Sequence, residues 1–425
     1  MTAFDLPDLV HKIFDDQEVT PDARAILAQP DRQIAVSVPL RRDDGSLAVF
    51  PGWRCQFNTT LGPAKGGIRF HPGVTAEECT QLAFWMTIKC ALMELPFGGG
   101  KGGAQVDPKD LSPLEVERLA RGYIGAIADV IGPDRDIPAP DVNTDARVMG
   151  WMADEFAKIT RRHEPACITG KPVCLGGSEG RTQATGRGAL IVLDAWLERE
   201  GRKPEDVTVA VQGFGNAGAH FACLAHERGY RIVAVSDSQA AIHDPDGLTP
   251  SKLLDYKQKE KELSGALYAD SSVKEGNGGE EIAQEDLLAL DVDVLVLAAM
   301  EDAITEDNAG TVTAPLILEI ANGPVTPEAD AMLVKDGKVI LPDVLANAGG
   351  VTVSYYEWVQ GRTGERWGAA TVTDRLTERM EAIAEACFDR AGDDDIPVRE
   401  AAYAKAITRI ADAISSRGDR SYFAG

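Results

Sequence analysis

The sequence predicts an α/β protein with two domains, and two observations carry this prediction. The 425 residues exceed the size that one hydrophobic core usually organises, and 44% of them are apolar, which is ample for globular burial. Strand-like and helix-like segments alternate after Leu175, as expected for a parallel sheet with crossover helices. We therefore expect a first domain over 1–182, a second domain over 183–350, a return connection over 351–371, and terminal helices over about 372–425 that complete the first domain.

The first domain is expected to combine a β-hairpin with helices. Residues 34–38 and 47–49 alternate apolar and polar side chains around a tight Asp-Gly turn, which is the pattern of two paired strands. Apolar residues recur at helical spacing over 75–92, and Thr75 provides a capping start. A second helix is predicted over 112–131, with a proline in its first turn.

The second domain is expected to hold a buried parallel sheet. An apolar strand over 207–212 leads into glycines and a helix over 216–228, and a second strand follows over 231–237. Two later apolar runs, 292–299 and 316–321, indicate further buried strands. This order of elements is typical of a dinucleotide-binding sheet.

Two glycine-rich segments are expected to be connections. The stretch 176–188 has the composition of a hinge between the domains. The loop 274–279 is expected to be exposed and mobile, because it combines glycines with charged and polar residues.

A glycine motif follows the first strand of the second domain. Gly213-Phe-Gly-Asn-Ala-Gly218 fits the pattern GxGxxG, which occurs by chance too often to decide anything alone. Its context is specific, because the glycines join an apolar strand to a helix and Asp237 ends the next strand. Gly213 permits the tight turn, Gly215 lets a pyrophosphate approach the helix N-terminus, and Gly218 permits close helix–strand packing. The motif predicts a Rossmann-like dinucleotide-binding domain.

Asp237 bears on the choice of dinucleotide. Its carboxylate should accept hydrogen bonds from the adenosine ribose and repel a 2′-phosphate. No arginine or lysine follows closely in the sequence, since the next one is Lys252. The sequence therefore favours NAD, while Ser236 and Ser238 could hold a phosphate and leave NADP or dual use open.

Two glycine-rich segments of the first domain each surround a lysine. Lys65 lies in GPAKGGIR, and Lys101 lies in GGGKGG, where five glycines around one lysine are very rare by chance. A nucleotide-triphosphate loop is excluded, because the pattern GxxxxGK[ST] needs a glycine where Leu95 stands and a Ser or Thr where Gly102 stands. Lys89 lies on the intervening helix. Three lysines that converge on one cleft would suit a dianionic amino acid.

One of these lysines could act chemically. A free lysine is almost fully protonated at neutral pH, but burial among backbone donors and other ammonium groups would favour the neutral amine that can act as a base. Asp141 follows a proline-stiffened loop and is a candidate proton shuttle, although an Asp after a proline is more often a turn or cap residue.

Seven ordered motifs carry a resemblance to a known family. They are GPAKGGIRFHP, MTIKCALMELPFGGGKGG, IPAPDVNTD, GRTQATGRG, GFGNAG, ANGPVTPEAD and LANAGGVTVSYYEW. From about Asp31 to the C-terminus, the chain resembles the glutamate/leucine/phenylalanine/valine dehydrogenase family, and within it the glutamate dehydrogenases. The resemblance implies an N-terminal α/β substrate and oligomerisation domain, a homohexamer, and interconversion of L-glutamate with 2-oxoglutarate and ammonium by hydride transfer to NAD(P).

The resemblance also implies roles for individual residues. Lys101 matches the catalytic lysine that activates water, and Asp141 matches the acid that moves a proton to and from the substrate amine. Lys65 and Ser354 match the pair that holds the side-chain carboxylate, and Lys89 matches the α-carboxylate site. Further substrate-pocket positions are Gly66, Met86, Arg181 and Val351, and positions that meet the dinucleotide are Thr185, Gly213, Phe214, Gly215, Asn216, Ala217, Gly218, Asp237, Ser238, Ala298, Ala299, Asn322 and Asn347.

The implied mechanism begins with domain closure about a hinge near residues 181–188, which excludes water. Hydride transfer from the substrate Cα to the nicotinamide gives an iminium, which water held by Lys101 attacks. Asp141 then passes a proton to the departing ammonia.

Lys65 indicates which substrate is used. The branched-chain and aromatic members of the family are apolar at this position, because an unpaired ammonium would be stranded beside a leucine side chain. A lysine favours glutamate, since a paired carboxylate relieves that cost. Two alternatives stay open: a branched-chain or aromatic amino acid dehydrogenase of the same family, and a non-catalytic dinucleotide-binding regulatory subunit.

The composition argues against other classes of protein. A formal net charge of −24 repels nucleic acid and anionic membranes, and it fits either salt adaptation or an ordinary acidic enzyme. Seven scattered cysteines without CxxC and six histidines without HExxH predict neither disulfides nor a metal site. The sequence has no apolar run of membrane-spanning length and no signal-like start, so we expect a cytoplasmic protein.

Overall fold

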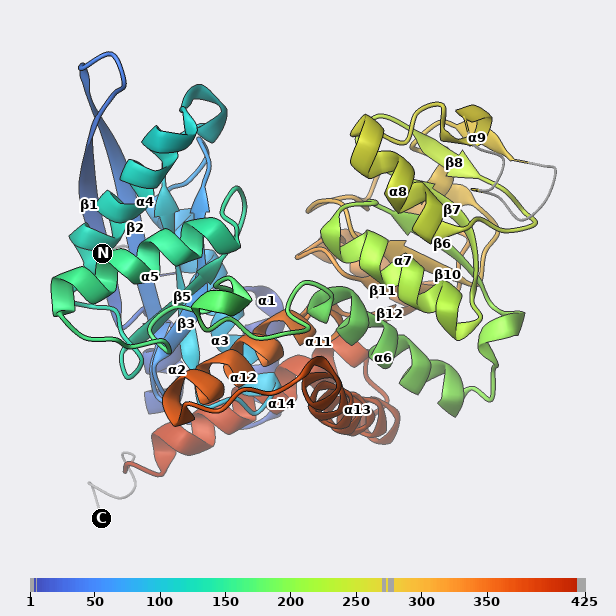
Figure 1. Cartoon of the computed structure of the whole chain (residues 1–425). Coiled ribbons are helices and arrows are strands. Elements are labelled where there is room, and N and C mark those ends of the chain that lie inside the picture. The colour runs from blue at the N-terminus through green and yellow to red at the C-terminus, as the bar shows by residue number, and fades with distance from the viewer. Residues whose placement is uncertain (1–3, 5, 270–272, 274–278, 419–425) are drawn as a thin grey trace. The chain divides into compact units, whose positions relative to one another are not determined.

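The computed structural model describes residues 4, 6–269, 273 and 279–418 (Figure 1). The chain divides into two compact units. Unit 1 consists of Met1–Arg181, Val351–Val372 and Tyr403–Gly425, and unit 2 consists of Thr182–Gly350 and Thr373–Ala402.

Unit 1 is built on a five-stranded mixed sheet. Its strands follow the order β1 (Arg32–Arg41), β2 (Leu47–Asn58), β4 (Gly98–Ala104), β3 (Ala64–Phe70) and β5 (Asp136–Pro140). β1, β2 and β4 pair antiparallel, whereas β3 runs parallel to β4 and to β5. The predicted hairpin of β1 and β2 is confirmed, and Gly45 at φ +86° forms its turn. Both strands are longer than the alternating pattern indicated.

The helices of unit 1 begin at side chains that cap them. Thr75 accepts a hydrogen bond from the Glu78 N–H at the start of α3 (Ala76–Leu92). Ser112 and Glu115 form a capping box at the start of α4 (Pro113–Ile127). Both predicted helices are confirmed, and α4 ends earlier than expected because the chain turns back at Val130. The remaining helices that lie wholly or largely in unit 1 are α1 (Asp8–Asp16), α2 (Pro21–Leu27), α5 (Ala146–Thr160) and α12 (Gly349–Thr363).

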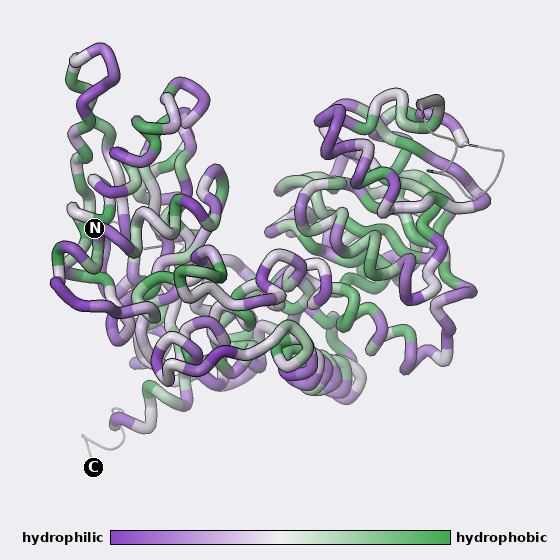
Figure 2. The backbone as a smooth tube through the Cα atoms, in the orientation of Figure 1, coloured by the Kyte–Doolittle hydropathy of each residue, from purple (hydrophilic) through white to green (hydrophobic). Residues whose placement is uncertain are grey.

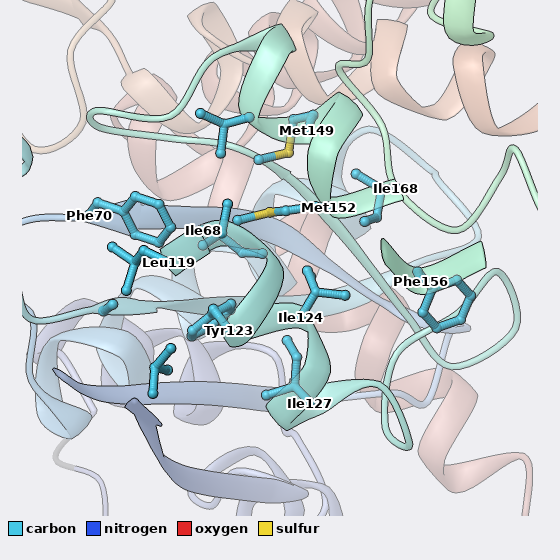
Figure 3. Packing of buried hydrophobic residues seen from close by; sticks show 14 of the residues in the cluster. Ile68, Phe70, Leu119, Tyr123, Ile124, Ile127, Met149, Met152, Phe156 and Ile168 are labelled. Atoms are coloured by element: carbon cyan, nitrogen blue, oxygen red, sulfur yellow. The ribbon is translucent and has the colours of Figure 1, made fainter. Parts of the chain in front are cut away.

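The core of unit 1 lies where α4 and α5 cover the sheet (Figure 3). Ile68 and Phe70 from β3 meet Tyr123 from α4 and Met152 from α5, and none of these side chains is exposed. Burial of one such side chain contributes about 1.5–3 kcal/mol. This packing holds β3 and the adjacent β4 rigidly, and these two strands carry the lysines considered below.

Unit 2 is built on a seven-stranded sheet. The order is β12 (Val339–Leu341), β11 (Leu316–Glu319), β10 (Val294–Leu297), β6 (Thr208–Gln212), β7 (Arg231–Ser236), β8 (Ala241–His243) and β9 (Glu280–Ile282). The first five strands are parallel, and β8 and β9 continue antiparallel. The four predicted strands are confirmed, whereas β8, β9 and β12 have only three residues each and escaped prediction.

The five parallel strands of this sheet are largely apolar along their length (Figure 2), as expected where helices cover a parallel sheet on both faces. The helices of unit 2 are α6 (Ala184–Arg199), α7 (Asn216–Arg228), α8 (Pro250–Glu260), α9 (Ala266–Ala269), α10 (Pro327–Lys335), α11 (Asp343–Ala346) and most of α13 (Ala369–Asp394). Except for Gly279, the glycine-rich loop expected at 274–279 lies outside the described residues. Within the described residues, none of the helices combines the length and apolar character that a bilayer crossing requires.

The C-terminal helices differ from the expectation that all of 372–425 completes the first domain. Residues 373–402 group with unit 2, and only residues from Tyr403 onward, in the later part of α14 (Val398–Ser415), group with unit 1. The contacts of α13 explain this, because Arg199 of α6 pairs with Glu385 and Asp389 at 2.6 and 2.7 Å. Likewise, the segment 351–371, expected to be a connection, is mostly helix α12 within unit 1.

Candidate active site

The glycine-rich run around Lys101 is strand β4, buried at all seven positions. Its glycines are required by close contacts on both faces. A Cβ on Gly99 would lie 2.1 Å from the Ala83 carbonyl oxygen of α3, and a Cβ on Gly102 would lie 2.4 Å from the Tyr123 hydroxyl of α4. Two helices therefore approach this strand as closely as its backbone allows. Lys101 is the only residue of the strand with a long side chain, and it is 5% exposed.

The two predicted catalytic residues, Lys101 and Asp141, form an ion pair. Asp141 follows β5, and its second carboxylate oxygen accepts a hydrogen bond from Arg69 Nε at 2.9 Å. Burial alone would raise the pKa of Asp141, but the charges of Lys101 and Arg69 outweigh it and lower the pKa to about 2. Thr144 Oγ1 accepts the Asp141 N–H at 2.8 Å and fixes the loop. Asp141 is thus a carboxylate at neutral pH.

Lys65 is a buried cation on β3, with 1% of its surface exposed. Burial lowers the pKa of its ammonium group to about 7, and the guanidinium groups of Arg181 and Arg54 act in the same direction. Within the described part of the chain, the Lys65 ammonium has no hydrogen bond and no ion pair. A buried charge without a partner is costly, so this position is suited to an anion supplied from outside the chain.

Ser354 and Arg181 lie on the same side of unit 1 as Lys65. Arg181 Nε donates to Ser354 Oγ at 3.2 Å, and the positive charge of Arg181 acts on Lys65. Ser354 is held there by its neighbours on α12, since Tyr355 and Trp358 pack edge-on against Phe97 with ring centroids 5.7 and 5.3 Å apart. Phe97 directly precedes β4, so α12 is anchored beside the strand of Lys101.

The other predicted pocket residues fall around the same strands. Gly66 follows Lys65 on β3, and a Cβ there would lie 1.5 Å from the Gly100 carbonyl oxygen and 3.4 Å from Met86 Cγ. Lys89 is buried in the last turn of α3. Val351 is buried near the start of α12, one helical turn before Ser354. The structure therefore brings Gly66 and Met86 together and places Lys89 on the helix that packs against β4.

Two buried ion pairs near this site were missed by the sequence analysis. Arg54 of β2 forms a bidentate pair with Asp136 of β5, both fully buried, and Arg54 Nη1 also donates to the Gly67 carbonyl oxygen at 3.0 Å. Lys171 pairs with Glu357 of α12 at 2.6 Å, and both are 1% exposed. These pairs tie β2, β3, β5 and α12 into one frame. No local pattern signals them, because the partners are 82 and 186 residues apart.

The glycine motif of unit 2 has the geometry of a dinucleotide loop. Gly213 has φ +96°, and a Cβ there would lie 2.5 Å from the Ala299 nitrogen. A Cβ on Gly218 would lie 2.0 Å from the Gly213 carbonyl oxygen, so this glycine permits close packing of α7. Gly215 caps α7 and has nothing within 4 Å of its Cβ position. The open space lies at the helix N-terminus, where a pyrophosphate would be stabilised.

The side-chain amide of Asn347 also suits the binding of a nicotinamide ring. Its Nδ2 donates to the Ile320 carbonyl oxygen at 3.1 Å and to Asn322 Oδ1 at 2.9 Å. Its Oδ1 is buried and has no hydrogen-bond partner among the described residues. A carboxamide N–H could satisfy this acceptor, because a buried unpaired oxygen costs about 1–3 kcal/mol.

The remaining predicted dinucleotide positions lie on the same sheet or next to it. Ala298 follows β10, and its N–H donates to the Gln212 carbonyl oxygen at 2.7 Å. Asn216 begins α7 and donates to the Thr182 carbonyl oxygen at 3.2 Å, and Thr185 lies in the first turn of α6, which packs against α7. Phe214 is buried, so only its backbone faces the loop. Ala217 is half-buried, and Ser238 and Ala299 are exposed.

The Asp237 carboxylate is held by four donors from the chain itself. Its Oδ1 accepts the N–H groups of Gln239 and Ala240 at 2.9 and 3.1 Å, and its Oδ2 accepts the Leu263 N–H at 3.0 Å and the Lys257 ammonium at 2.8 Å. A carboxylate has about four lone-pair positions, so all are occupied. Asp237 therefore has none left for ribose hydroxyls. The order of residues along the chain does not show the nearest base in space, because α8 folds back and brings Lys257 to Asp237.

The two units together match one family of enzymes. Residues 176–418 match Glutamate/Leucine/Phenylalanine/Valine dehydrogenase, and residues 30–158 match the dimerisation domain of the same family. This chain belongs to the Glu/Leu/Phe/Val dehydrogenase family.

Individual relatives are similar along nearly the whole chain. An NADP-specific glutamate dehydrogenase of Synechocystis sp. is 50% identical over 405 residues, which cover 95% of this chain and 94% of that one. An NAD-specific glutamate dehydrogenase of Staphylococcus aureus is 43% identical over 393 residues, 92% of each chain. Among solved structures, a hetero-hexameric glutamate dehydrogenase from Thermus thermophilus has a TM-score of 0.89 at 38% identity, covering 97% of this chain and 96% of that one.

Proposed function

We propose that this chain catalyses the reversible oxidative deamination of L-glutamate to 2-oxoglutarate and ammonia, with NAD or NADP as the hydride acceptor. The observation that carries this proposal is the buried Lys65 ammonium, which has no partner among the residues that the structure describes, beside the Arg181–Ser354 hydrogen bond. Relatives at 43–50% identity that are named glutamate dehydrogenases support it.

The substrate would be held by its two carboxylates. The side-chain carboxylate would pair with Lys65 and accept a hydrogen bond from Ser354, which removes the cost of the buried cation. The α-carboxylate would bind Lys89 at the end of α3. Gly66, Met86 and Val351 would line the apolar part of the pocket, with Arg181 behind Ser354. A leucine side chain would leave the Lys65 charge unpaired, so this pocket selects a five-carbon diacid.

Lys101 and Asp141 would carry the proton transfers. Asp141 is ionised at neutral pH, so it can accept a proton from the substrate ammonium and return it to departing ammonia. Lys101 would hold the water that attacks the iminium carbon, after its ion pair with Asp141 opens to admit the substrate. When bound, the nicotinamide ring supplies the acceptor for the hydride of the substrate Cα.

Unit 2 would hold the dinucleotide. The backbone of 213–218 and the start of α7 would bind the pyrophosphate, and Asn347 would accept the carboxamide N–H through its unpaired Oδ1. Thr185, Asn216, Asn322 and the 298–299 turn would complete this site.

The assembly and location follow from the same proposal. Unit 1, which contains all of the matched dimerisation domain, would serve substrate binding and oligomerisation, and the chain would form a homohexamer. A hetero-hexameric relative supports the number of subunits. All seven cysteines are free, which fits a reducing cytoplasm.

An activity panel tests the proposal. Purified protein is assayed with glutamate, leucine and phenylalanine against NAD and NADP, and with 2-oxoglutarate and ammonium in reverse. Glutamate should be preferred by about 10³-fold, and Lys65→Leu should shift preference toward leucine or norleucine. Preference for leucine in the wild type would favour a branched-chain amino acid dehydrogenase. Dinucleotide binding without any turnover would favour a regulatory subunit.

A further inference from the structure

Asp237, the residue that follows β7, pairs with a lysine that is distant in the sequence. Lys257 lies on α8, twenty residues after Asp237, and its ammonium is 2.8 Å from Asp237 Oδ2. The side chain of Asp237 is 5% exposed, whereas the side chain of Lys257 is 22% exposed. The lysine is therefore the more accessible side chain of the pair.

This pair lies at the edge of the sheet where the glycine turn begins. The N–H groups of Gly213 and Phe214 both donate to the Ser236 carbonyl oxygen, at 3.0 and 2.6 Å, and Ser236 directly precedes Asp237. In a doubly wound sheet, the end of the second strand is where the adenosine ribose of a bound dinucleotide lies. The Asp237–Lys257 pair therefore faces the ribose position of the proposed dinucleotide.

The charge of the pair differs from that of a lone carboxylate. A lone Asp237 would repel a 2′-phosphate, but its negative charge is balanced by the ammonium at 2.8 Å. An ammonium has three N–H donors, and among the described residues Lys257 uses them only on Asp237. It can therefore keep this contact and donate to a phosphate oxygen as well. NAD has no 2′-phosphate, and when it binds, the Asp237 carboxylate keeps its four donors and neither gains nor loses a hydrogen bond. The site therefore accepts NAD as well.

We infer that Lys257 binds the 2′-phosphate of NADP and makes the chain accept NADP as well as NAD. Lys257 is a specificity-determining residue that acts directly on the phosphate, whereas Asp237 positions it. The inference rests on the proposed use of a dinucleotide by unit 2. Relatives named NADP-specific and NAD-specific at 50% and 43% identity show that both preferences occur in this family.

Binding of two small nucleotides tests this without any reaction. The dissociation constants of 2′,5′-ADP and 5′-AMP are measured by titration calorimetry with the full-length protein. Lys257→Gln should weaken 2′,5′-ADP by about tenfold, the effect of losing one charge-assisted hydrogen bond at a partly exposed site, and should leave 5′-AMP unchanged. Lys257→Arg should retain most of the 2′,5′-ADP affinity. Lys259→Gln, an exposed lysine on the same helix, is the matched control and should change neither.

Initial rates provide a second measurement. The ratio of kcat/KM for NADPH to that for NADH should fall by the same factor in Lys257→Gln. If Lys257→Gln weakened the binding of 2′,5′-ADP and of 5′-AMP equally, Lys257 would only stabilise the 261–263 turn, and the inference would be overturned. Unchanged binding of 2′,5′-ADP, or a wild type that prefers 5′-AMP by about a hundredfold, would also overturn it. Because nucleotide binding needs no amino acid, failure of glutamate turnover would refute the proposed function and leave this result intact.

Discussion

The titration of Lys65 makes a quantitative prediction about ligand binding. Burial and the nearby guanidinium of Arg181 lower the pKa of Lys65 to about 7. The ammonium, which would bind the side-chain carboxylate, dominates below that pH and is lost above it. Affinity for a diacid should therefore be highest at about pH 6 and fall as the pH rises. Two pH units above the pKa, the loss is about a hundredfold, or about 2.7 kcal/mol.

Glutarate is the suitable probe, because it has both carboxylates and no amine that would titrate. Its dissociation constant is measured at intervals from about pH 6 to about pH 9, beside that of pentanoate, which lacks the second carboxylate. The ratio of the two constants removes any contribution of Lys89 and Lys101 to the shared carboxylate. The ratio should change by about a hundredfold for the wild type, and it should be small and independent of pH for Lys65→Met. A constant ratio in the wild type would mean that Lys65 does not meet the second carboxylate.

Three further substitutions, one of them with a matched control, test the proton carrier, a buried ion pair and the close packing of β4. Asp141→Asn removes the carboxylate that accepts the proton, so kcat should fall by about 10²–10⁴-fold while nucleotide affinity measured by calorimetry is unchanged; a smaller loss would exclude Asp141 as the proton carrier. Arg54→Met leaves the fully buried Asp136 carboxylate without its cation and with only the Gln56 amide as a side-chain donor, and urea unfolding should show a loss of about 3–5 kcal/mol; stability within about 1 kcal/mol of the wild type would contradict this. Gly102→Ala places a Cβ 2.4 Å from the Tyr123 hydroxyl and 2.5 Å from a backbone oxygen of β2, and it should cost about 1–3 kcal/mol. Gly125→Ala on α4, where nothing lies within 4 Å, is its control and should stabilise by about 0.4–1 kcal/mol; equal effects would discount the steric argument.

Features that depend on a few neighbouring residues were predictable from the sequence. The cap at Thr75 and the hairpin turn at Gly45 are local, and both were found where expected. The motif 213–218 was interpretable because its strand, turn and helix are contiguous. The glycines around Lys101 were recognised as unusual, but their cause was not, since the sequence does not show how closely the flanking helices α3 and α4 pack on the strand.

Features that depend on long-range packing were not predictable. Arg54 and Asp136 are 82 residues apart, and only the strand order brings them together. Lys257 was overlooked for the same reason, because distance along the chain was used to judge whether a base lies near Asp237. The grouping of 373–402 with unit 2 depends on pairs such as Arg199–Glu385, which no periodicity reveals.

Strand β4 has a consequence for how well Lys101 keeps its place. Five of the seven residues of this strand are glycines. The strand on either side of Lys101 therefore has no side-chain rotamers that could change when neighbouring groups change. Its position is set by backbone hydrogen bonds to β2 and β3 and by the close approach of α3 and α4. Replacement of nearby core residues by others of equal volume should leave Lys101 undisturbed, whereas almost any single substitution within the strand would displace it. Strand β4 therefore fixes the position of the Lys101 amine, and in turn tolerates almost no substitution of its own residues.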